Sequence, residues 1–210
     1  MLSLSFAPAA MHENSKRMFA RYALSLVRPD SRVLEIGPDG VPGTYATMVE
    51  RALGRAPAAW HTIDLAARPG MTFAARSEYE FPLADDGYDV VLAGQVLEHV
   101  RKPWRWVPEL ARVCRRGGHV VTISPVTWPY HEAPVDCWRA YPEGLRALFE
   151  DAGLTVVEAR WETLERRGFL PRLPRPVNEH AAGFWFALAR RLRWPFARAW
   201  DAITIGRKPG

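Results

Sequence analysis

The fold of this chain is decided near its start, by residues 32–43, which read RVLEIGPDGVPG. Apolar residues on both sides of Glu35 form a short run that stops at Gly37, as a buried strand does. Glycines and prolines fill the turn that follows, and a helix is expected over residues 44–53. A strand, a glycine-bearing turn and a helix in this order predict the beginning of a parallel α/β sheet.

Strands and helices continue to alternate along the rest of the chain. Further buried strands are predicted at residues 59–63, 88–93, 119–123, 154–159 and 202–206, and helices at residues 11–27 and 142–152. One more helix has Pro108 in its first turn, Gly117 at its end and an apolar face made of Val107, Leu110, Ala111 and Cys114. The expected fold class is therefore α/β, with a Rossmann-like, doubly wound sheet that is mostly parallel.

The whole chain, residues 1–210, is expected to form a single domain. It would begin with the helix over residues 11–27 and hold an insertion, about residues 161–200, between the last two strands. Within the insertion, residues 178–192 place apolar side chains on one helical face and arginines outside it. This face would cover the core or the acceptor pocket, form a homodimer contact or rest on an acidic membrane surface.

Composition and charge narrow the class of protein. The net charge is +5, but the part from Arg160 onward holds 11 Lys and Arg against 4 Asp and Glu, so the positive charge belongs to one segment. No apolar run is long enough to span a membrane, and the N-terminus lacks the basic leader of a signal peptide. Two cysteines predict neither a disulfide framework nor a zinc cluster, so a cytoplasmic protein is expected.

Acidic residues at the predicted strand ends point to the ligand. Such sheets bind ligands at the carboxyl ends of their strands, where Glu35 precedes the glycine turn and Asp64 follows the second strand. Asp64 can accept both ribose hydroxyls of a nucleoside, and Ser77 and Glu78 offer an edge for adenine. A carboxylate at Glu35 repels the pyrophosphate of NAD but suits the ammonium and sulfonium groups of S-adenosylmethionine (SAM). SAM is therefore favoured over a dinucleotide.

Five motifs occur in a fixed order: VLEIGP (33–38), FPLADDGYDVV (81–91), VLEHV (96–100), RRGG (115–118) and IGRKP (205–209). Together they resemble the motifs of class I SAM-dependent methyltransferases, in the small-molecule branch of the ubiquinone-biosynthesis and sugar-methylating type. The resemblance implies a seven-stranded sheet with an antiparallel last strand, and SAM as the cofactor. The cofactor contacts expected from it are Glu35, Gly37, Pro38, Gly40, Asp64, Leu65, Ser77, Glu78 and Gln95.

The chain departs from the family pattern at two of these places. Asp39 stands where the family has its second glycine, and Gly40 is displaced by one position. This changes the turn that would surround the methionine part of SAM. Ser77 stands where the family commonly has a carboxylate for adenine, which passes that contact toward Glu78.

The candidate catalytic residues are histidines near the predicted strand ends. A hydroxyl acceptor must lose its proton, and a well-placed histidine is a common base. His131 is the first candidate, with Asp136 able to orient its imidazole, and His99 is the second. A plain loop role for His131, a helix-anchoring role for His99, and an ion pair between Asp136 and Arg139 are the alternatives.

The loop that carries His131 also supplies the expected acceptor contacts, which are Trp128, Tyr130, Asp136 and Arg139. Its aromatic and polar side chains suit stacking on a saccharide ring and bonding to the ring hydroxyls. His131, Asp136 and Glu132 could together hold a divalent metal ion, but their spacing matches no strong metal-ligand signature, so no metal ligand is assigned.

The predicted function is O-methylation of a small molecule, with a sugar or glycoside hydroxyl as the first choice of acceptor. Phenolic, amine and carbon acceptors are alternatives, and so is a regulatory or structural protein that binds SAM without catalysis. A nucleic-acid methyltransferase is disfavoured, because residues 93–95 read AGQ in place of the Asn/Asp-Pro-Pro-aromatic run used on base amines. A nicotinamide-dependent dehydrogenase ranks last.

Overall fold

The computed structural model describes residues 13–128, 130–131, 135–165 and 199–210. The strands are β1 (Arg32–Ile36), β2 (Ala59–Asp64), β3 (Phe73–Ala74), β4 (Tyr88–Gly94), β5 (Cys114–Thr127), β6 (Thr155–Glu162) and β7 (Trp200–Arg207). The α-helices are α1 (Glu13–Met18), α2 (Thr44–Leu53), α3 (Pro103–Val113) and α4 (Pro142–Asp151). Short stretches of π-helix and 3₁₀-helix form η1 (Phe19–Ala23), η2 (Leu24–Leu26) and η3 (Leu97–His99).

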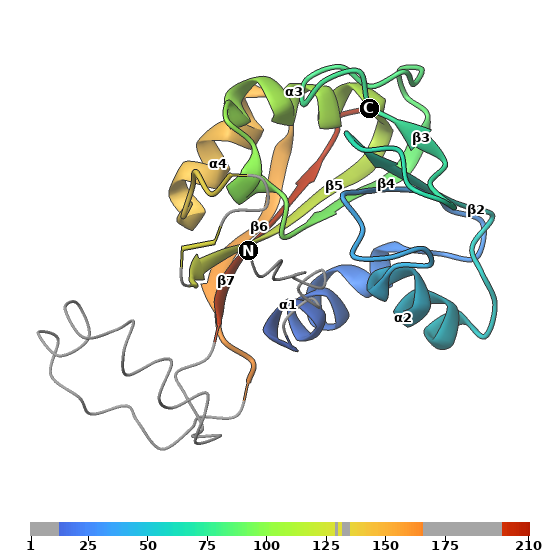
Figure 1. The fold of residues 1–210 in the computed structure, drawn as a ribbon, viewed down its shortest axis with the longest axis horizontal. Helices are drawn as coiled ribbons and strands as arrows, with labels where there is room; N and C mark the ends of the chain where they lie inside the picture. Colours follow the sequence, from blue (N-terminus) through green and yellow to red (C-terminus); the bar gives the residue numbers. More distant parts are fainter. Residues whose placement is uncertain (1–12, 129, 132–134, 166–198) are drawn as a thin grey trace, which may run out of the picture.

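The described strands form one seven-stranded sheet in the order β3-β2-β1-β4-β5-β7-β6 (Figure 1). Neighbouring strands run parallel from β3 to β5, and β7 runs antiparallel to both β5 and β6. The order turns back between β1 and β4, which is where sheets of this kind bind their ligands. The predicted α/β class, the doubly wound sheet and the antiparallel last strand are confirmed.

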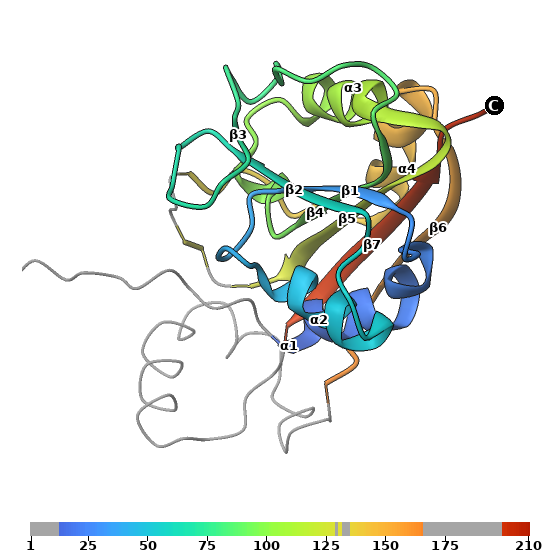
Figure 2. The ribbon, with the colours of Figure 1, turned by 90° about the vertical axis from the view of Figure 1, so that its right-hand side faces the viewer.

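Two layers of helices cover the sheet, with α1 and α2 on one face and α3 and α4 on the other (Figure 2). Side chains alternate between the faces along each strand. Leu34 and Ile36 of β1 belong to the apolar cluster under α3 and α4, whereas Val33 belongs to the cluster under α1 and α2. Glu35 follows the parity of Val33 and therefore lies on the face covered by α1 and α2.

The N-terminal helix differs from its prediction. A single helix over residues 11–27 was expected, but within the described residues the α-helix ends at Met18 and π- and 3₁₀-turns continue to Leu26. The wider π-turn carries Ala23 into the core beside Met18 and Phe19, whereas Tyr22 stays partly exposed. Tyr22 and Leu26 still pack against this core, so the expectation that is wrong is one regular α-helix continuing beyond Met18.

The helix before β5 also differs from its prediction. It begins at Pro103, so Pro108 lies inside it and not in its first turn. It ends at Val113, and Cys114 is the first residue of β5, paired with Tyr88 of β4. Helical spacing in the sequence continues through Cys114, but strand pairing decides the boundary, because it satisfies the backbone there.

The insertion is bounded by strands that reach further than expected, since β6 runs to Glu162 and β7 begins at Trp200. The helix predicted at residues 178–192 lies outside the described residues, and so do residues 11 and 12. Among the described residues, no helix combines the length and the apolar character needed to cross a bilayer.

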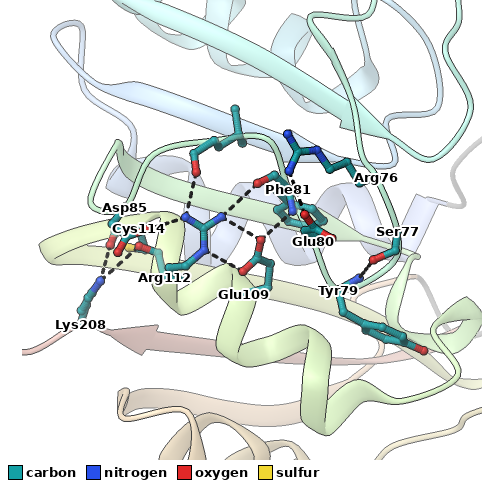
Figure 3. A network of polar contacts seen from close by, with 11 residues as sticks. Arg76, Ser77, Tyr79, Glu80, Phe81, Asp85, Glu109, Arg112, Cys114 and Lys208 are labelled. Carbon is teal, nitrogen blue, oxygen red and sulfur yellow. Dashed lines mark hydrogen bonds and ion pairs between the residues drawn. The ribbon is translucent and has the colours of Figure 1, made fainter.

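An ion-pair network, here called the Arg112 clamp, fastens the loop before β4 to α3 (Figure 3). Arg112 donates to the two carboxylate oxygens of Glu109 at 2.8 Å. It also donates to the carboxylate of Asp85 and to the carbonyls of Phe81 and Leu83, over 2.6–3.1 Å. Glu109 in turn accepts the backbone N–H of Phe81 at 2.6 Å. The network therefore holds residues 81–85, the first part of the FPLADDGYDVV motif, in place.

Candidate active site

Glu35 is delivered by β1 to the start of α2. Its side chain is 1% exposed, and the indole N–H of Trp60 donates to its carboxylate at 2.8 Å. A Cβ placed on Gly43 would lie 3.1 Å from both carboxylate oxygens, so a glycine there lets the backbone approach the acid. Burial raises the pKa of Glu35 to about 7, partly offset by the Trp60 hydrogen bond. A cationic ligand would relieve the cost of ionising this group.

The glycine turn between β1 and α2 explains the first departure from the family pattern. Gly37 adopts a φ of +60°, and a Cβ there would lie 2.8 Å from Val96. Asp39 accepts the backbone N–H of Thr44 at 2.8 Å and also the hydroxyl of Thr44. Asp39 therefore caps the N-terminus of α2, a structural use for the residue that replaces the second glycine.

A cavity of about 450 Å³ opens beside this turn, lined by Lys16, Asp39, Gly40, Pro42, Gly43, Thr44, Thr47, Met48 and Arg51. Neither Glu35 nor Asp64 belongs to this lining. Glu35 nevertheless lies close behind this lining, because its carboxylate is next to Gly43.

Asp64 ends β2 on the same edge of the sheet. Because Ile63 pairs with Ile36 of β1, Asp64 lies level with the start of the glycine turn. Its carboxylate accepts the backbone N–H of Leu65 at 2.6 Å and the guanidinium of Arg68 at 2.7 Å. Arg68 also donates to the carbonyl of Pro38 at 2.9 Å, which links the loop after β2 to the glycine turn.

Ser77 and Glu78, expected to contact adenine, and Gln95, which follows β4, lie at the same edge of the sheet as Asp64. Ser77 accepts the backbone N–H of Tyr79 at 3.2 Å. The carboxylate of Glu78 accepts from Arg101 at 3.0 Å and from the hydroxyl of Tyr79 at 2.5 Å, so it links two loops. Gln95 follows β4 with a φ of +59°, a left-handed conformation that is uncommon for a residue with a side chain.

Gln95 joins a buried polar network that the sequence did not reveal. Its side-chain amide donates to Asp201 of β7 at 3.1 Å, and the amide of Asn14 donates to the same carboxylate at 2.6 Å. Nearby, Ser15 of α1 shares a 2.7 Å hydrogen bond with the hydroxyl of Tyr45 of α2. The network joins the ends of β4 and β7 to the two helices below them.

His131 and Asp136 come together in the loop after β5. Asp136 accepts the backbone N–H of His131 at 2.9 Å, and its carboxylate lies 3.4 Å from Nδ1 of the His131 ring. Arg139 also donates to Asp136, at 2.6 Å. These hydrogen bonds, with that from Arg139 the strongest, lower the pKa of Asp136 to about 2. Orientation of His131 and an ion pair with Arg139 are thus both present.

His99 lies beside His131, with ring centroids 5.1 Å apart and the rings nearly perpendicular. Its Nδ1 hydrogen-bonds to the carbonyl of Val135, and its Nε2 lies 3.9 Å from the carboxylate of Glu98. Burial lowers the pKa of His99, which favours the neutral imidazole that can accept a proton. The structure therefore places both predicted catalytic histidines in one cluster.

Glu98 is the member of this cluster to which the sequence assigned no role. It is 1% exposed, and neither of its carboxylate oxygens has a hydrogen-bond partner within the described residues. Burial raises the pKa of Glu98 to about 8, and the charge of Arg139 offsets this in part. We call Glu98, His99, His131, Asp136 and Arg139 the acceptor-side cluster.

Aromatic side chains surround this edge of the sheet. Trp128 and Tyr130, both expected to contact the acceptor, are 40% and 71% exposed. Trp161 at the end of β6 lies 4.9 Å from Trp200 and 5.9 Å from Tyr141, between ring centroids. These three rings were not predicted, because they meet only when β6, β7 and the start of α4 are assembled.

Comparison with known proteins finds methyltransferases among those that are similar to this chain in sequence or in fold. Residues 44–122 match the family described as a methyltransferase domain. An uncharacterized methyltransferase of Mycobacteroides abscessus is 34% identical over 172 residues, which cover 77% of this chain and 60% of that protein. One from Mycobacterium bovis is 46% identical over 61 residues, which cover 29% of this chain and 23% of that protein. The chain thus spans only part of the length of these relatives.

The fold is shared with a SAM-dependent methyltransferase of Archaeoglobus fulgidus, whose structure superposes with a TM-score of 0.60. The two chains are 18% identical, and the match covers 92% of each. At this identity the likeness concerns the fold. Residues 44–122 therefore resemble a methyltransferase domain, and the chain shares the fold of this SAM-dependent methyltransferase.

Proposed function

We propose that this protein transfers the methyl group of SAM to a hydroxyl group of a small molecule. The observation that supports this most directly is the placement of two kinds of group on one edge of the sheet. Glu35 and Asp64 flank the glycine turn there, and His99 and His131 face each other after β4 and β5. A cation-binding acid beside a pair of imidazoles suits a positively charged donor and a hydroxyl acceptor.

The residues fit the cofactor at the glycine turn. Glu35 would face the ammonium group of the methionine part, since a buried carboxylate gains from a positive partner. Asp64 would take the ribose hydroxyls once Arg68 has released its carboxylate. When bound, SAM supplies a methyl group on a positively charged sulfur, which leaves as the neutral thioether of S-adenosylhomocysteine (SAH).

The acceptor-side cluster would prepare the hydroxyl. His131 is proposed as the general base, because the carboxylate of Asp136 lies 3.4 Å from its Nδ1 and can stabilise the protonated ring. His99 is proposed as the second candidate. The imidazole would take up the proton that the acceptor hydroxyl loses when its oxygen receives the methyl group and the electron pair of the carbon–sulfur bond remains with the departing SAH. Holding the two reactants in line supplies much of the remaining rate enhancement.

A sugar or glycoside hydroxyl is the proposed acceptor class. Exposed aromatic rings such as Trp128 can stack on a saccharide, and Asp136 and Arg139 supply polar groups for its hydroxyls. A phenolic hydroxyl fits the same base and is the second candidate within this proposal.

The test has two parts. Calorimetry should detect binding of SAH by the purified protein, and methyl transfer should be measured against a panel of sugars, glycosides and phenols. We expect His131→Ala to lower turnover at least about tenfold while the SAH affinity changes little, because the base acts on the acceptor. An equal loss of both would instead assign His131 a structural role. Binding of SAH without turnover on any acceptor would favour a non-catalytic SAM-binding protein.

A further inference from the structure

The geometry points to a binding site for a divalent first-row transition metal ion, formed by Glu98, His99 and His131. One ligand atom from each of these residues lies within 4.8 Å of the other two. A metal ion bonded to all three at about 2.0–2.2 Å would require separations below that distance between its ligands, so only small side-chain adjustments are needed. Two imidazoles and one carboxylate are a common ligand set for such ions.

The carboxylate of Glu98 supplies an independent reason to expect a cation. It is 1% exposed, and its two oxygens have no hydrogen-bond partner within the described part of the chain. Buried carboxylates are normally paired, hydrogen-bonded or bound to a metal, because leaving one without a partner is costly. The only group within ion-pair distance in the described structure is Nε2 of His99, at 3.9 Å. A cation bound here would give the carboxylate of Glu98 the partner that it lacks.

The surroundings of the two histidines match the pattern of metal-binding imidazoles. Such rings usually give one ring N–H to a carbonyl or carboxylate, which fixes the ring and directs the other nitrogen at the metal. Nδ1 of His99 hydrogen-bonds to the carbonyl of Val135, and Nδ1 of His131 faces the carboxylate of Asp136 at 3.4 Å. Both rings therefore have the outer partner that a metal ligand requires.

Sequence spacing could not reveal this site. The acidic candidates near His131 in the sequence are Glu132 and Asp136. Asp136 is held by Arg139, and Glu132 lies outside the described residues. Glu98 and His99 follow β4, whereas His131 follows β5, and only the pairing of these two neighbouring strands brings them together.

The metal site does not depend on the proposed function. The effect of the metal on the acceptor hydroxyl does rest on that function. A divalent cation lowers the pKa of a hydroxyl bound to it. In the metal-loaded protein, His99 and His131 would serve as ligands, and the acceptor hydroxyl would be activated by the cation. In the metal-free protein, His131 would keep the role of general base.

The experiment is an optical titration with Co²⁺ of the full chain, without a polyhistidine tag, after dialysis against a chelator. Co²⁺ is the probe because bound ions of this kind give visible absorption bands that report nitrogen and oxygen ligands. We expect one Co²⁺ per chain, and at least about a tenfold weaker affinity in Glu98→Gln and in His131→Ala, as for the loss of one ligand. Mg²⁺, which avoids imidazole ligands, should compete poorly.

Two control variants should bind Co²⁺ like the wild type. Glu143→Gln removes an exposed carboxylate on α4, and His61→Asn removes a histidine of β2 outside the cluster. Far-ultraviolet circular dichroism checks that each variant is folded, and His99→Ala replaces any variant that is not. No saturable Co²⁺ binding, or binding that survives in Glu98→Gln, His99→Ala and His131→Ala alike, would overturn the metal site.

The same samples separate this proposal from the proposed function. Uptake of SAH and methyl transfer without any Co²⁺ binding would refute the metal site and leave the function in place. Co²⁺ binding by the cluster in a protein that takes up no SAH would do the reverse.

Discussion

Two carboxylates on neighbouring elements, the partly buried Glu109 and the buried Glu98, have opposite surroundings. In the Arg112 clamp, Glu109 accepts from the guanidinium of Arg112 and from the backbone of Phe81 (Figure 3). In the acceptor-side cluster, Glu98 is more deeply buried and its oxygens accept from no described residue. The carboxylate with a structural role, Glu109, is therefore paired within the chain. The carboxylate of Glu98, at the edge where a ligand is expected, has no hydrogen-bond partner among the described residues.

Glu35 lies between these extremes and resembles Glu98 more. One indole N–H donates to its carboxylate, and burial is the dominant influence on its pKa. Glu35 lies near the carboxyl end of β1 and Glu98 in η3 just after β4, whereas Glu109 is in the middle of α3. Substitutions at the two kinds of position should consequently change stability in opposite directions.

The largest expected effect is a gain of stability in Glu35→Gln at alkaline pH. The pKa of Glu35 is about 7 in the folded chain, above its ordinary value of 4.5. Between these values the folded state holds more protons than the unfolded state, so wild-type stability falls as the pH rises through this window. Glutamine avoids that loss, and at about pH 8 it should raise the free energy of unfolding by about 3 kcal/mol, measured by urea denaturation.

The same variant should show no gain at about pH 4, where the wild-type carboxylate is protonated in both states. It should also bind SAH more weakly, because the negative partner of the ammonium group is lost. If the variant differed from the wild type by the same free energy of unfolding at both pH values, or bound SAH as tightly as the wild type, Glu35 would not be a carboxylate kept for a ligand.

Breaking the closed network should have a smaller effect of opposite sign. Arg112→Ala leaves Glu109 and two backbone carbonyls without their donor, and should lower the free energy of unfolding by about 2 kcal/mol. The matched control is Arg76→Ala, which removes an ion pair with Glu80 whose partners are 68% and 59% exposed. That control should cost less than about 0.5 kcal/mol. Equal losses in the two variants would mean that the clamp contributes no more than an ordinary surface pair.

Asp64→Ala should affect binding more than stability. The carboxylate is partly exposed and is expected to hold the ribose, so we predict an SAH affinity about tenfold weaker by calorimetry. Asp151→Asn, at the exposed end of α4, serves as the control for the loss of one surface carboxylate. Unchanged SAH affinity in Asp64→Ala would place the nucleoside elsewhere.

The smallest expected effect belongs to Arg68→Ala. Arg68 donates to Asp64 at 2.7 Å and so competes with the ribose hydroxyls for that carboxylate. Because an exposed ion pair is worth up to about 1 kcal/mol, its removal should tighten SAH binding about threefold. A weaker affinity would instead show that Arg68 touches the ligand or holds the glycine turn and the loop after β2 in their binding positions.

Local sequence patterns correctly predicted the elements whose bounds depend on residues that are adjacent in the sequence. Strand β1 and helix α2 have the predicted bounds, because the apolar run, the glycine turn and the start of the helix are adjacent in the sequence. The boundary error at the end of α3 concerns Cys114, whose partner Tyr88 is distant along the chain. Helical periodicity contains no information about such a pairing.

The candidate site was likewise predictable only where the position of a residue depends on its neighbours in the sequence. Glu35 and Asp64 could be placed at the edge of the sheet, because Glu35 lies one residue before the end of a predicted strand and Asp64 directly follows another. Asp201 and the isolation of Glu98 could not, since both depend on contacts between segments from different parts of the chain. Solvent exclusion around a carboxylate is a property of the assembled fold, and a motif such as VLEHV marks the residue without its environment.

The reversed direction of β7 has a consequence for how this fold can change. In a purely parallel sheet, every crossover returns to the edge opposite the ligand before a new strand begins. Here β6 ends at Glu162 and β7 starts at Trp200 on the same edge, beside Thr127 at the end of β5. Residues added or lost in this one connection leave and rejoin the sheet at the carboxyl ends of the parallel strands, so this edge can change without disturbing the strand order.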